Sequence, residues 1–188
     1  MNIGIYGGTF NPIHRGHTSL ARSLVKQGLL DEVWLMVSPQ NPLKGSDSAP
    51  YDDRFRMAQI AVKNIRGVVP SDFERHLPLP SYTITTLTEL SQTYPQHQFH
   101  LIIGADNWKN FGRWYRSEDI LKTYPIIVYR RPGYDFDDSQ LKDCPNVKVA
   151  ETPLYDVSST EIRAHKKLRM LNPKVLQYIK ENHLYGYL

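Results

Sequence analysis

The chain has 188 residues, of which 40% are hydrophobic and 22% charged, which suffices for one domain with its own core. A single cysteine, Cys144, excludes an intrachain disulfide and a multi-cysteine zinc site, and no apolar run reaches the roughly 20 residues that cross a bilayer. The net charge of +4 suits an anionic ligand, and without a signal-peptide pattern we expect a cytoplasmic protein with no nucleic-acid or membrane partner.

The first half of the chain alternates between predicted strands and predicted helices. Residues 2–6 form a short apolar run that is typical of a buried strand. Apolar residues recur at helical spacing from Thr18 onward, and Gly28 marks the end of that helix. β-Branched and aromatic residues at 32–38 predict a second strand. A polar loop then leads to a helix at 52–65, whose first turn carries two acidic residues.

The second half continues the alternation with shorter elements. The predicted strands are a brief one within 67–73, then 99–104, 125–131 and 147–151. The predicted helices are 80–95 with Ser81 near its N-cap, 117–124 capped by Ser117, a helix beginning in 159–168 with a capping box, and a last one opened by Asn172 and Pro173.

This order of elements predicts the fold class. Strands that alternate with helices indicate βαβ units, so we expect an α/β fold with a Rossmann-like, doubly wound parallel sheet. We expect one domain over 1–188, with a small helical C-terminal part at about 158–188. Right-handed crossovers place the loops after the first and fourth strands at the carboxyl edge of the sheet, where ligands bind.

The stretch GGTFNPIHRGH, residues 7–17, joins the first strand to the first helix and is longer than an ordinary turn. Its adjacent glycines differ from the spacing of a dinucleotide-binding loop, and no Walker A sequence occurs in the chain. His14 and His17 are three residues apart, whereas a helical zinc motif separates its histidines by four, and no third ligand sits at a familiar spacing. We therefore predict no metal site within the protein.

The residue types of this stretch suit a phosphate. Gly7 and Gly8 let a ligand approach the backbone, and Thr9 offers a hydroxyl and an amide. The N-terminus of the following helix attracts anions, and the imidazoles of His14 and His17 add hydrogen-bond donors. The stretch thus predicts a site that binds an anion without a covalent nucleophile.

Several motifs together resemble a known family. The stretch 7–17 is similar to the signature of the nucleotidylyltransferase superfamily, in the form found in bacterial nicotinate-nucleotide adenylyltransferases. The resemblance covers nearly the whole chain: NPLK at 41–44, PSYTITTL at 80–87, IIGADN at 102–107, WY at 114–115, RRPGY at 130–134, SSTEIR at 158–163 and VLQYIKENHLY at 175–185. Each motif alone is weak, whereas this order and spacing are highly specific.

The resemblance implies a reaction. The adenylyl group of ATP is joined to the 5′-phosphate of nicotinate mononucleotide and pyrophosphate leaves, a step in NAD biosynthesis. Such transfers need two anions positioned and their developing charge stabilised. Mg²⁺ is implied as the ion that accompanies ATP, held mostly by phosphate oxygens and water. Whether the enzyme is a monomer or a homo-oligomer stays open.

The resemblance also implies site residues. The catalytic residues are expected to be His14, His17, Lys44 and Arg163. The residues expected to bind ATP are Gly7, Gly8, Thr9, Phe10, Gly104, Asp106, Ser158, Ser159 and Thr160. The residues expected to bind nicotinate mononucleotide are Asn41, Lys44, Arg54, Tyr82, Thr83, Trp114, Tyr115 and Arg131. Many family members carry an acid where this chain has Thr85, whose role the resemblance leaves open.

Other readings remain open. A relative that uses nicotinamide mononucleotide differs in one substrate group, which the sequence discriminates poorly. Pantetheine-phosphate adenylyltransferases and cytidylyltransferases share the histidine loop, but they do not usually combine it with SYT, GAD and SSTEIR. A non-catalytic nucleotide-binding module would be expected to lack the histidines or Lys44, and all three are present.

Overall fold

The computed structural model describes residues 1–39, 48–134, 141 and 144–187. Its six strands are β1 Asn2–Gly8, β2 Glu32–Val37, β3 Val68–Ser71, β4 Gln98–Gly104, β5 Ile126–Tyr129 and β6 Val147–Ala150. The α-helices are α1 Arg15–Lys26, α2 Tyr51–Val62, α3 Thr83–Thr93, α4 Ala105–Lys109, α5 Ser117–Thr123, α6 Ser159–Arg163 and α7 Pro173–Glu181. Short 3₁₀ turns include η1 Phe73–His76, η2 Phe111–Arg113, η4 Leu168–Met170 and η5 Leu184–Gly186.

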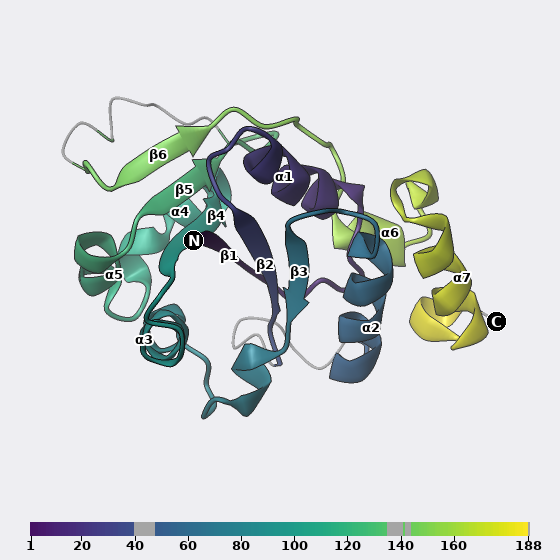
Figure 1. Ribbon diagram of the computed structural model, residues 1–188. Helices are drawn as coiled ribbons and strands as arrows, with labels where there is room; N and C mark the ends of the chain where they lie inside the picture. Colours follow the sequence, from purple (N-terminus) through teal and green to yellow (C-terminus); the bar gives the residue numbers. More distant parts are fainter. Residues whose placement is uncertain (40–47, 135–140, 142–143, 188) are drawn as a thin grey trace.

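The six strands form one parallel sheet in the order β3-β2-β1-β4-β5-β6 (Figure 1). This is the strand order of a doubly wound Rossmann sheet, so the predicted fold class is confirmed. The order reverses between β1 and β4, which are direct neighbours paired from Asn2↔Gln98 to Tyr6↔Ile102. The loops after β1 and β4 therefore leave the sheet side by side, and this reversal point is where ligands bind in such sheets.

Helices cover both faces of the sheet. Buried residues of α1, α2 and α7, such as Leu24, Met57 and Ile179, form one core with the sheet. Buried residues of α3 and α5, such as Leu87 and Ile120, form a second core on the opposite face. Figure 1 shows α1, α2 and α7 on one side and α3, α4 and α5 on the other. Covering both faces explains why the strands read as apolar runs without strict alternation.

Several predicted boundaries are wrong. The first helix begins at Arg15, three residues earlier than predicted, because His14 is its N-cap. Ser81 lies next to the N-cap of α3, as predicted, and the N-cap itself is Tyr82. The N-cap of α5 is the left-handed Arg116, whereas the predicted cap Ser117 is the first residue of that helix.

Two short segments differ from the expected pattern as well. The helix expected over 159–168 ends at Arg163, whereas its capping box of Ser158 and Glu161 is confirmed. The helix α4, which follows Gly104 directly, was not predicted because five residues are too few for a periodic pattern.

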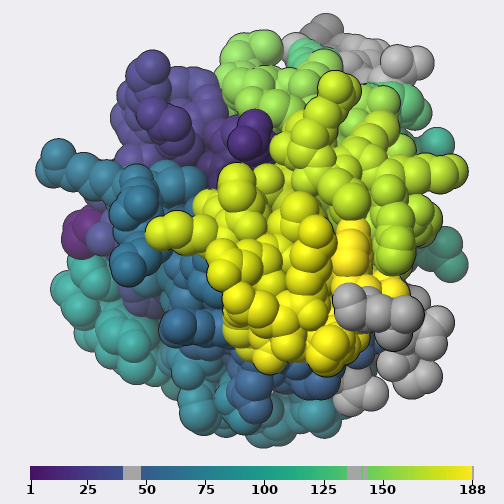
Figure 2. All heavy atoms as spheres, turned by 90° about the vertical axis from the view of Figure 1, so that its right-hand side faces the viewer, coloured from purple at the N-terminus to yellow at the C-terminus, as the bar shows by residue number. Residues whose placement is uncertain are grey.

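Beyond β6 the described elements are all helical: α6, η4, α7 and η5. Asn172 accepts a hydrogen bond from the Lys174 amide with Pro173 at the first helical position, so the predicted start of the last helix is confirmed. Figure 2 shows the C-terminal residues, in yellow, lying against α2, in blue. The Tyr178 hydroxyl donates to Asp53 Oδ1 of α2 at 2.8 Å across this contact. Along the described ranges, no helix is both long and apolar enough to cross a membrane.

Candidate active site

Gly7 and Gly8, the last two residues of β1, have different surroundings. A Cβ on Gly8 would lie 3.0 Å from the Phe10 ring, so this position favours glycine because the ring folds back over it. Open space surrounds Gly7, which leaves room for a ligand. Phe10 has a left-handed φ of 47° and is 3% exposed, and its ring contacts the His17 ring edge-on at 5.0 Å. The side chain predicted to bind ATP therefore supports the histidine from the core, and only its backbone faces the loop.

His14 and His17 form a stacked pair at the start of α1. Their ring centroids are 3.7 Å apart with an interplanar angle of 25°. The His14 amide donates to His17 Nδ1 at 3.2 Å, so neutral His17 carries its proton on Nε2 and presents a donor there. The pairing requires the spacing of three, since that separation returns a helix to the same face.

Burial decides the charge of His14. The ring is 6% exposed, and burial, followed by the nearby Arg131 guanidinium, lowers the pKa of His14 from 6.5 to about 4. The imidazole is neutral at pH 7 and offers a hydrogen bond without a full charge. Its Nδ1 is buried against the first turn of α1, 3.0 Å from the place where a Cβ on Gly16 would lie.

The second phosphate-binding motif is tied to the first. Ser159 Oγ at the start of α6 donates to the Pro12 carbonyl at 2.9 Å. Arg163 Nη1 donates to the Asn11 carbonyl at 2.6 Å and Nη2 to Thr160 Oγ1 at 3.2 Å. The stretches GGTFNPIHRGH and SSTEIR, both of which contain residues expected to bind ATP, are thus in contact across 147 residues of sequence. Arg163 helps to hold the two motifs together, in addition to any contact with phosphate.

Asp106 and Arg131 form an ion pair beside the histidines. Arg131 Nη1 lies 2.9 Å from Asp106 Oδ2, whereas Asp106 Oδ1 is buried without a partner among the described residues. A Cβ on Gly104 would lie 2.4 Å from that Oδ1, so only glycine admits this placement. Arg131 is expected to bind the mononucleotide, but its guanidinium pairs with Asp106, which is expected to bind ATP, and lies near the catalytic candidate His14.

Tyr6 and Tyr129, which lie beside the two histidines, were not predicted as site residues. Tyr6 and Tyr129 lie with their hydroxyl oxygens 3.2 Å apart, and they line a small cavity with His14, His17 and Arg131. Burial raises the pKa of both tyrosines, so both hydroxyls stay protonated. The sequence carries no signal for this pair, because a tyrosine in a strand looks the same whether it faces core or ligand.

The residues predicted to hold the nicotinate ring form a separate group. The Tyr82 and Tyr115 rings are 4.6 Å apart, and both side chains are exposed, at 40% and 56%. Thr83 begins α3, and the neighbouring Ser81 Oγ is buried without a partner among the described residues. Trp114 packs against Phe111 at the edge of the core, so Tyr82 and Tyr115 are the more accessible aromatic surface.

Arg54 does not have the position expected of a substrate ligand. Its side chain is buried, and Nε donates to the Ala49 carbonyl at 2.9 Å. Nη1 donates to the carbonyls of Thr9 at 2.7 Å and Ser38 at 2.8 Å, and Nη2 reaches Pro39 at 3.3 Å. With four hydrogen bonds to backbone carbonyls, Arg54 joins the loops after β1 and β2. These bonds give Arg54 a structural role that was not predicted, and its predicted contact with the mononucleotide stays a prediction.

Asn41 and Lys44 lie outside the described residues, so their predicted roles stay predictions.

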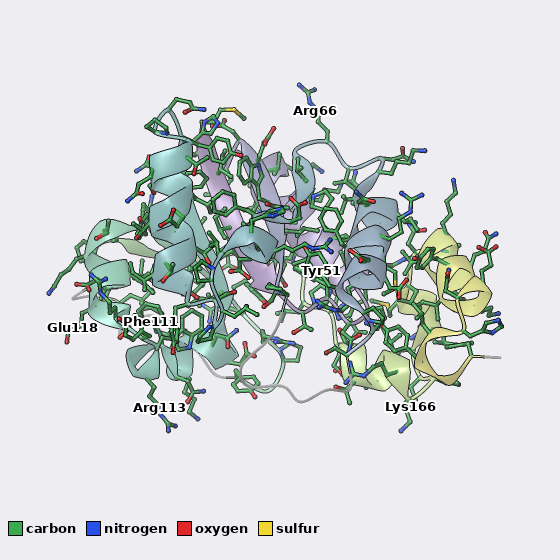
Figure 3. The ribbon with its side chains drawn as sticks, turned by 90° about the horizontal axis from the view of Figure 1, so that it is seen from below. Tyr51, Arg66, Phe111, Arg113, Glu118 and Lys166 are labelled. Atoms are coloured by element: carbon green, nitrogen blue, oxygen red, sulfur yellow. The ribbon has the colours of Figure 1, made fainter. Side chains whose placement is uncertain are left out.

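Figure 3 views the molecule from below Figure 1, the side to which β3 points. Tyr51 lies near the middle of this view, and Phe111 and Lys166 lie on opposite sides. Within the described ranges, no group of three or more His, Cys, Asp or Glu side chains could hold a metal ion. Near the histidines, Asp106 pairs with Arg131 and Glu161 with Lys167.

An open groove of about 1240 Å³ lies between α1, α2, α7 and β3. Among the described residues that line it, His14 is the one predicted site residue. The groove therefore lies mainly outside the site that the motifs form.

Comparisons with known proteins agree with the geometry. A family model for cytidylyltransferase-like proteins matches residues 5–165. A Bacteroides thetaiotaomicron protein named "Probable nicotinate-nucleotide adenylyltransferase" is 46% identical over 187 residues, covering 96% of this chain and 92% of that protein. A Flavobacterium johnsoniae protein of the same name is 40% identical over 191 residues, covering 98% and 99%.

A solved structure shares the fold. The Plasmodium falciparum nicotinic acid mononucleotide adenylyltransferase complexed with NaAD has a TM-score of 0.86 with this chain at 22% identity, covering 100% of this chain and 98% of that one. This likeness shows that the two proteins share a fold, and the sequence matches show the family. The chain belongs to the nicotinate-nucleotide adenylyltransferase family of cytidylyltransferase-like proteins.

Proposed function

We propose that the protein transfers the adenylyl group of ATP to nicotinate mononucleotide, forming nicotinate adenine dinucleotide and pyrophosphate. The observation that carries this proposal is the junction of the two phosphate-binding motifs, where Ser159 and Arg163 bond to the loop that ends in His14 and His17. The relatives named for this activity support the same choice of reaction.

In the reaction, an oxygen of the mononucleotide 5′-phosphate attacks the α-phosphorus of ATP. The bond from that phosphorus to the bridging oxygen breaks, and pyrophosphate leaves with the electron pair. The attacking phosphate is already ionised, so the protein needs no general base. His17 Nε2 and the neutral His14 ring donate hydrogen bonds to the phosphate oxygens, where charge develops in the transition state. The first amides of α1 add positive potential.

Each substrate has a place in this proposal. The unpartnered Asp106 Oδ1 accepts from a ribose hydroxyl of ATP, while Arg131 holds the other carboxylate oxygen. The nicotinate ring lies against Tyr82 and Tyr115, and its carboxylate meets Thr83 at the N-terminus of α3. Lys44, from the resemblance, is proposed to contact phosphate. Mg²⁺ enters with ATP and screens the triphosphate.

Pyrophosphate release with three acceptors tests the proposal. The purified protein is mixed with ATP and Mg²⁺, and with nicotinate mononucleotide, nicotinamide mononucleotide or phosphopantetheine. We expect fast release with nicotinate mononucleotide alone and a dinucleotide product by mass spectrometry. Preference for the amide would overturn the carboxylate pocket at Thr83. Release with phosphopantetheine only, or with none of the three, would overturn the proposed function.

A further inference from the structure

The side chain of Asn11 is a meeting point of distant segments. It is 6% exposed within the loop after β1. Asn11 Oδ1 accepts from the Ala49 amide at 3.0 Å and from the Tyr185 hydroxyl at 2.7 Å, across 174 residues of sequence. Its carbonyl accepts from Arg163 at 2.6 Å. One residue of the loop that carries the histidines is therefore bonded to α6, to the segment that leads into α2, and to the C-terminus.

Arg54 belongs to the same network of hydrogen bonds around the loop after β1. It donates to the carbonyls of Ala49 and Thr9, while the Ala49 amide donates to Asn11. The loop is thus held at Thr9 and at Asn11, on either side of the left-handed Phe10. The Tyr185 hydroxyl connects the C-terminal segment of the chain to this network of hydrogen bonds.

The placement of Tyr185 is unusual. Its φ of 56° lies in the left-handed region, which disfavours a bulky side chain, so its surroundings must hold it there. His165 Nε2 lies 3.0 Å from its carbonyl and donates to it. Burial raises the pKa of Tyr185, so the hydroxyl remains a donor at neutral pH. A strained residue that presents one hydroxyl to a buried amide suggests a positional role rather than simple packing.

We propose that Tyr185 is a positioning residue for adenylyl transfer. By donating to Asn11 it fixes the loop after β1, and through that loop it aligns His14 and His17 with the reacting phosphate. Small displacements of preorganised donors reduce rate more than binding, because alignment matters most in the transition state. The proposal rests on the proposed function, and it extends the active site to the last residues of the described chain.

Tyr185→Phe tests this proposal, because it removes the hydroxyl and keeps the ring. We expect kcat to fall about tenfold, with the KM of each substrate within twofold and the folded state intact by circular dichroism. Tyr187→Phe is the matched control, since the Tyr187 hydroxyl is buried and has no hydrogen-bond partner among the described residues. It should keep the wild-type kcat. A kcat of Tyr185→Phe within twofold of wild type would overturn the proposal.

Asn11 variants test whether the effect passes through Asn11. If it does, Asn11→Ala and the double variant Asn11→Ala/Tyr185→Phe should have the same kcat within twofold. Asn11→Asp keeps an acceptor at this position and should retain most of the activity. Multiplicative losses in the double variant would mean that Tyr185 acts elsewhere.

A measurement without turnover separates this inference from the proposed function. The ring NMR signals of His14 and His17 in the free protein should shift in Tyr185→Phe and stay in place in Tyr187→Phe. Unchanged signals would contradict the inference even if the wild-type enzyme turns over as proposed. Shifted signals would support it even if the acceptor assay identified another substrate.

Discussion

At the scale of single residues, the site works with neutral imidazoles. His14 is buried, and His17 is oriented by the His14 amide and by the edge of Phe10. These contacts preorganise hydrogen-bond donors and avoid the cost of holding two charged rings in a stack.

His17→Ala should lower kcat at least a hundredfold. It removes a preorganised donor, and such a loss costs roughly 2.7–4 kcal/mol of transition-state stabilisation. Steady-state kinetics at saturating ATP and nicotinate mononucleotide measure the effect, with circular dichroism to confirm folding. A control is His183→Ala, an exposed histidine near the C-terminus. A near-normal rate for His17→Ala would remove this residue from the mechanism.

The free energy of unfolding should fall as pH decreases from 6.5 to about 4. In that window the unfolded chain protonates His14 while the folded protein keeps it neutral, so the unfolded state binds more protons and is favoured by acid. A shift from 6.5 to about 4 corresponds to about 3 kcal/mol. Urea unfolding of wild type and His14→Asn across this range measures it. Identical pH slopes for the two proteins would contradict the assignment.

At the scale of elements, the loops after β1 and β2 depend on α2. Arg54 reaches from this helix to carbonyls of both loops. An exposed arginine and a buried one look the same in a sequence, so the resemblance alone led to a ligand role. The contact between the loop after β1 and α6 is consistent with the sequence, because parallel strands bring their carboxyl ends to one edge and residues of both segments are expected to bind ATP.

Arg54→Met should lower the free energy of unfolding by roughly 3 kcal/mol or more, since several buried carbonyls lose their donor at about 1–3 kcal/mol each. Thermal unfolding should then shift down by about 6–12 °C at this size. Arg56→Met, at an exposed position of the same helix, is the control and should change little. If Arg54→Met instead kept its stability and raised only the KM of the mononucleotide, the original ligand assignment would be correct.

Tyr115→Ala should raise the KM of nicotinate mononucleotide about tenfold, which corresponds to about 1.4 kcal/mol of lost stacking and apolar contact. The KM of ATP should stay within twofold, because Tyr82 and Tyr115 form a group separate from His14 and Asp106. Initial rates with each substrate varied in turn measure both constants. Equal increases in the two constants would contradict a specific nicotinate surface.

At the scale of the whole molecule, the alternation of strands and helices was enough to predict the sheet and its reversal point. It was not enough to predict where the C-terminal residues pack. Tyr185 meets Asn11 across 174 residues, and no local pattern reports a contact of that range. Tyr6 and Tyr129 meet across the sheet for the same reason. Contacts that tertiary packing creates are invisible to periodicity, whereas motifs carried on single loops are not.

We infer that the loop after β1 and α6 form one phosphate site at the reversal point of the sheet. A crystal structure of the protein with Mg²⁺, a non-hydrolysable ATP analogue and nicotinate mononucleotide tests it most directly. The account predicts the triphosphate between the rings of His14 and His17 and the start of α6, with the nicotinate ring at Tyr82 and Tyr115. A triphosphate bound in the groove between α1, α2 and α7 would contradict it.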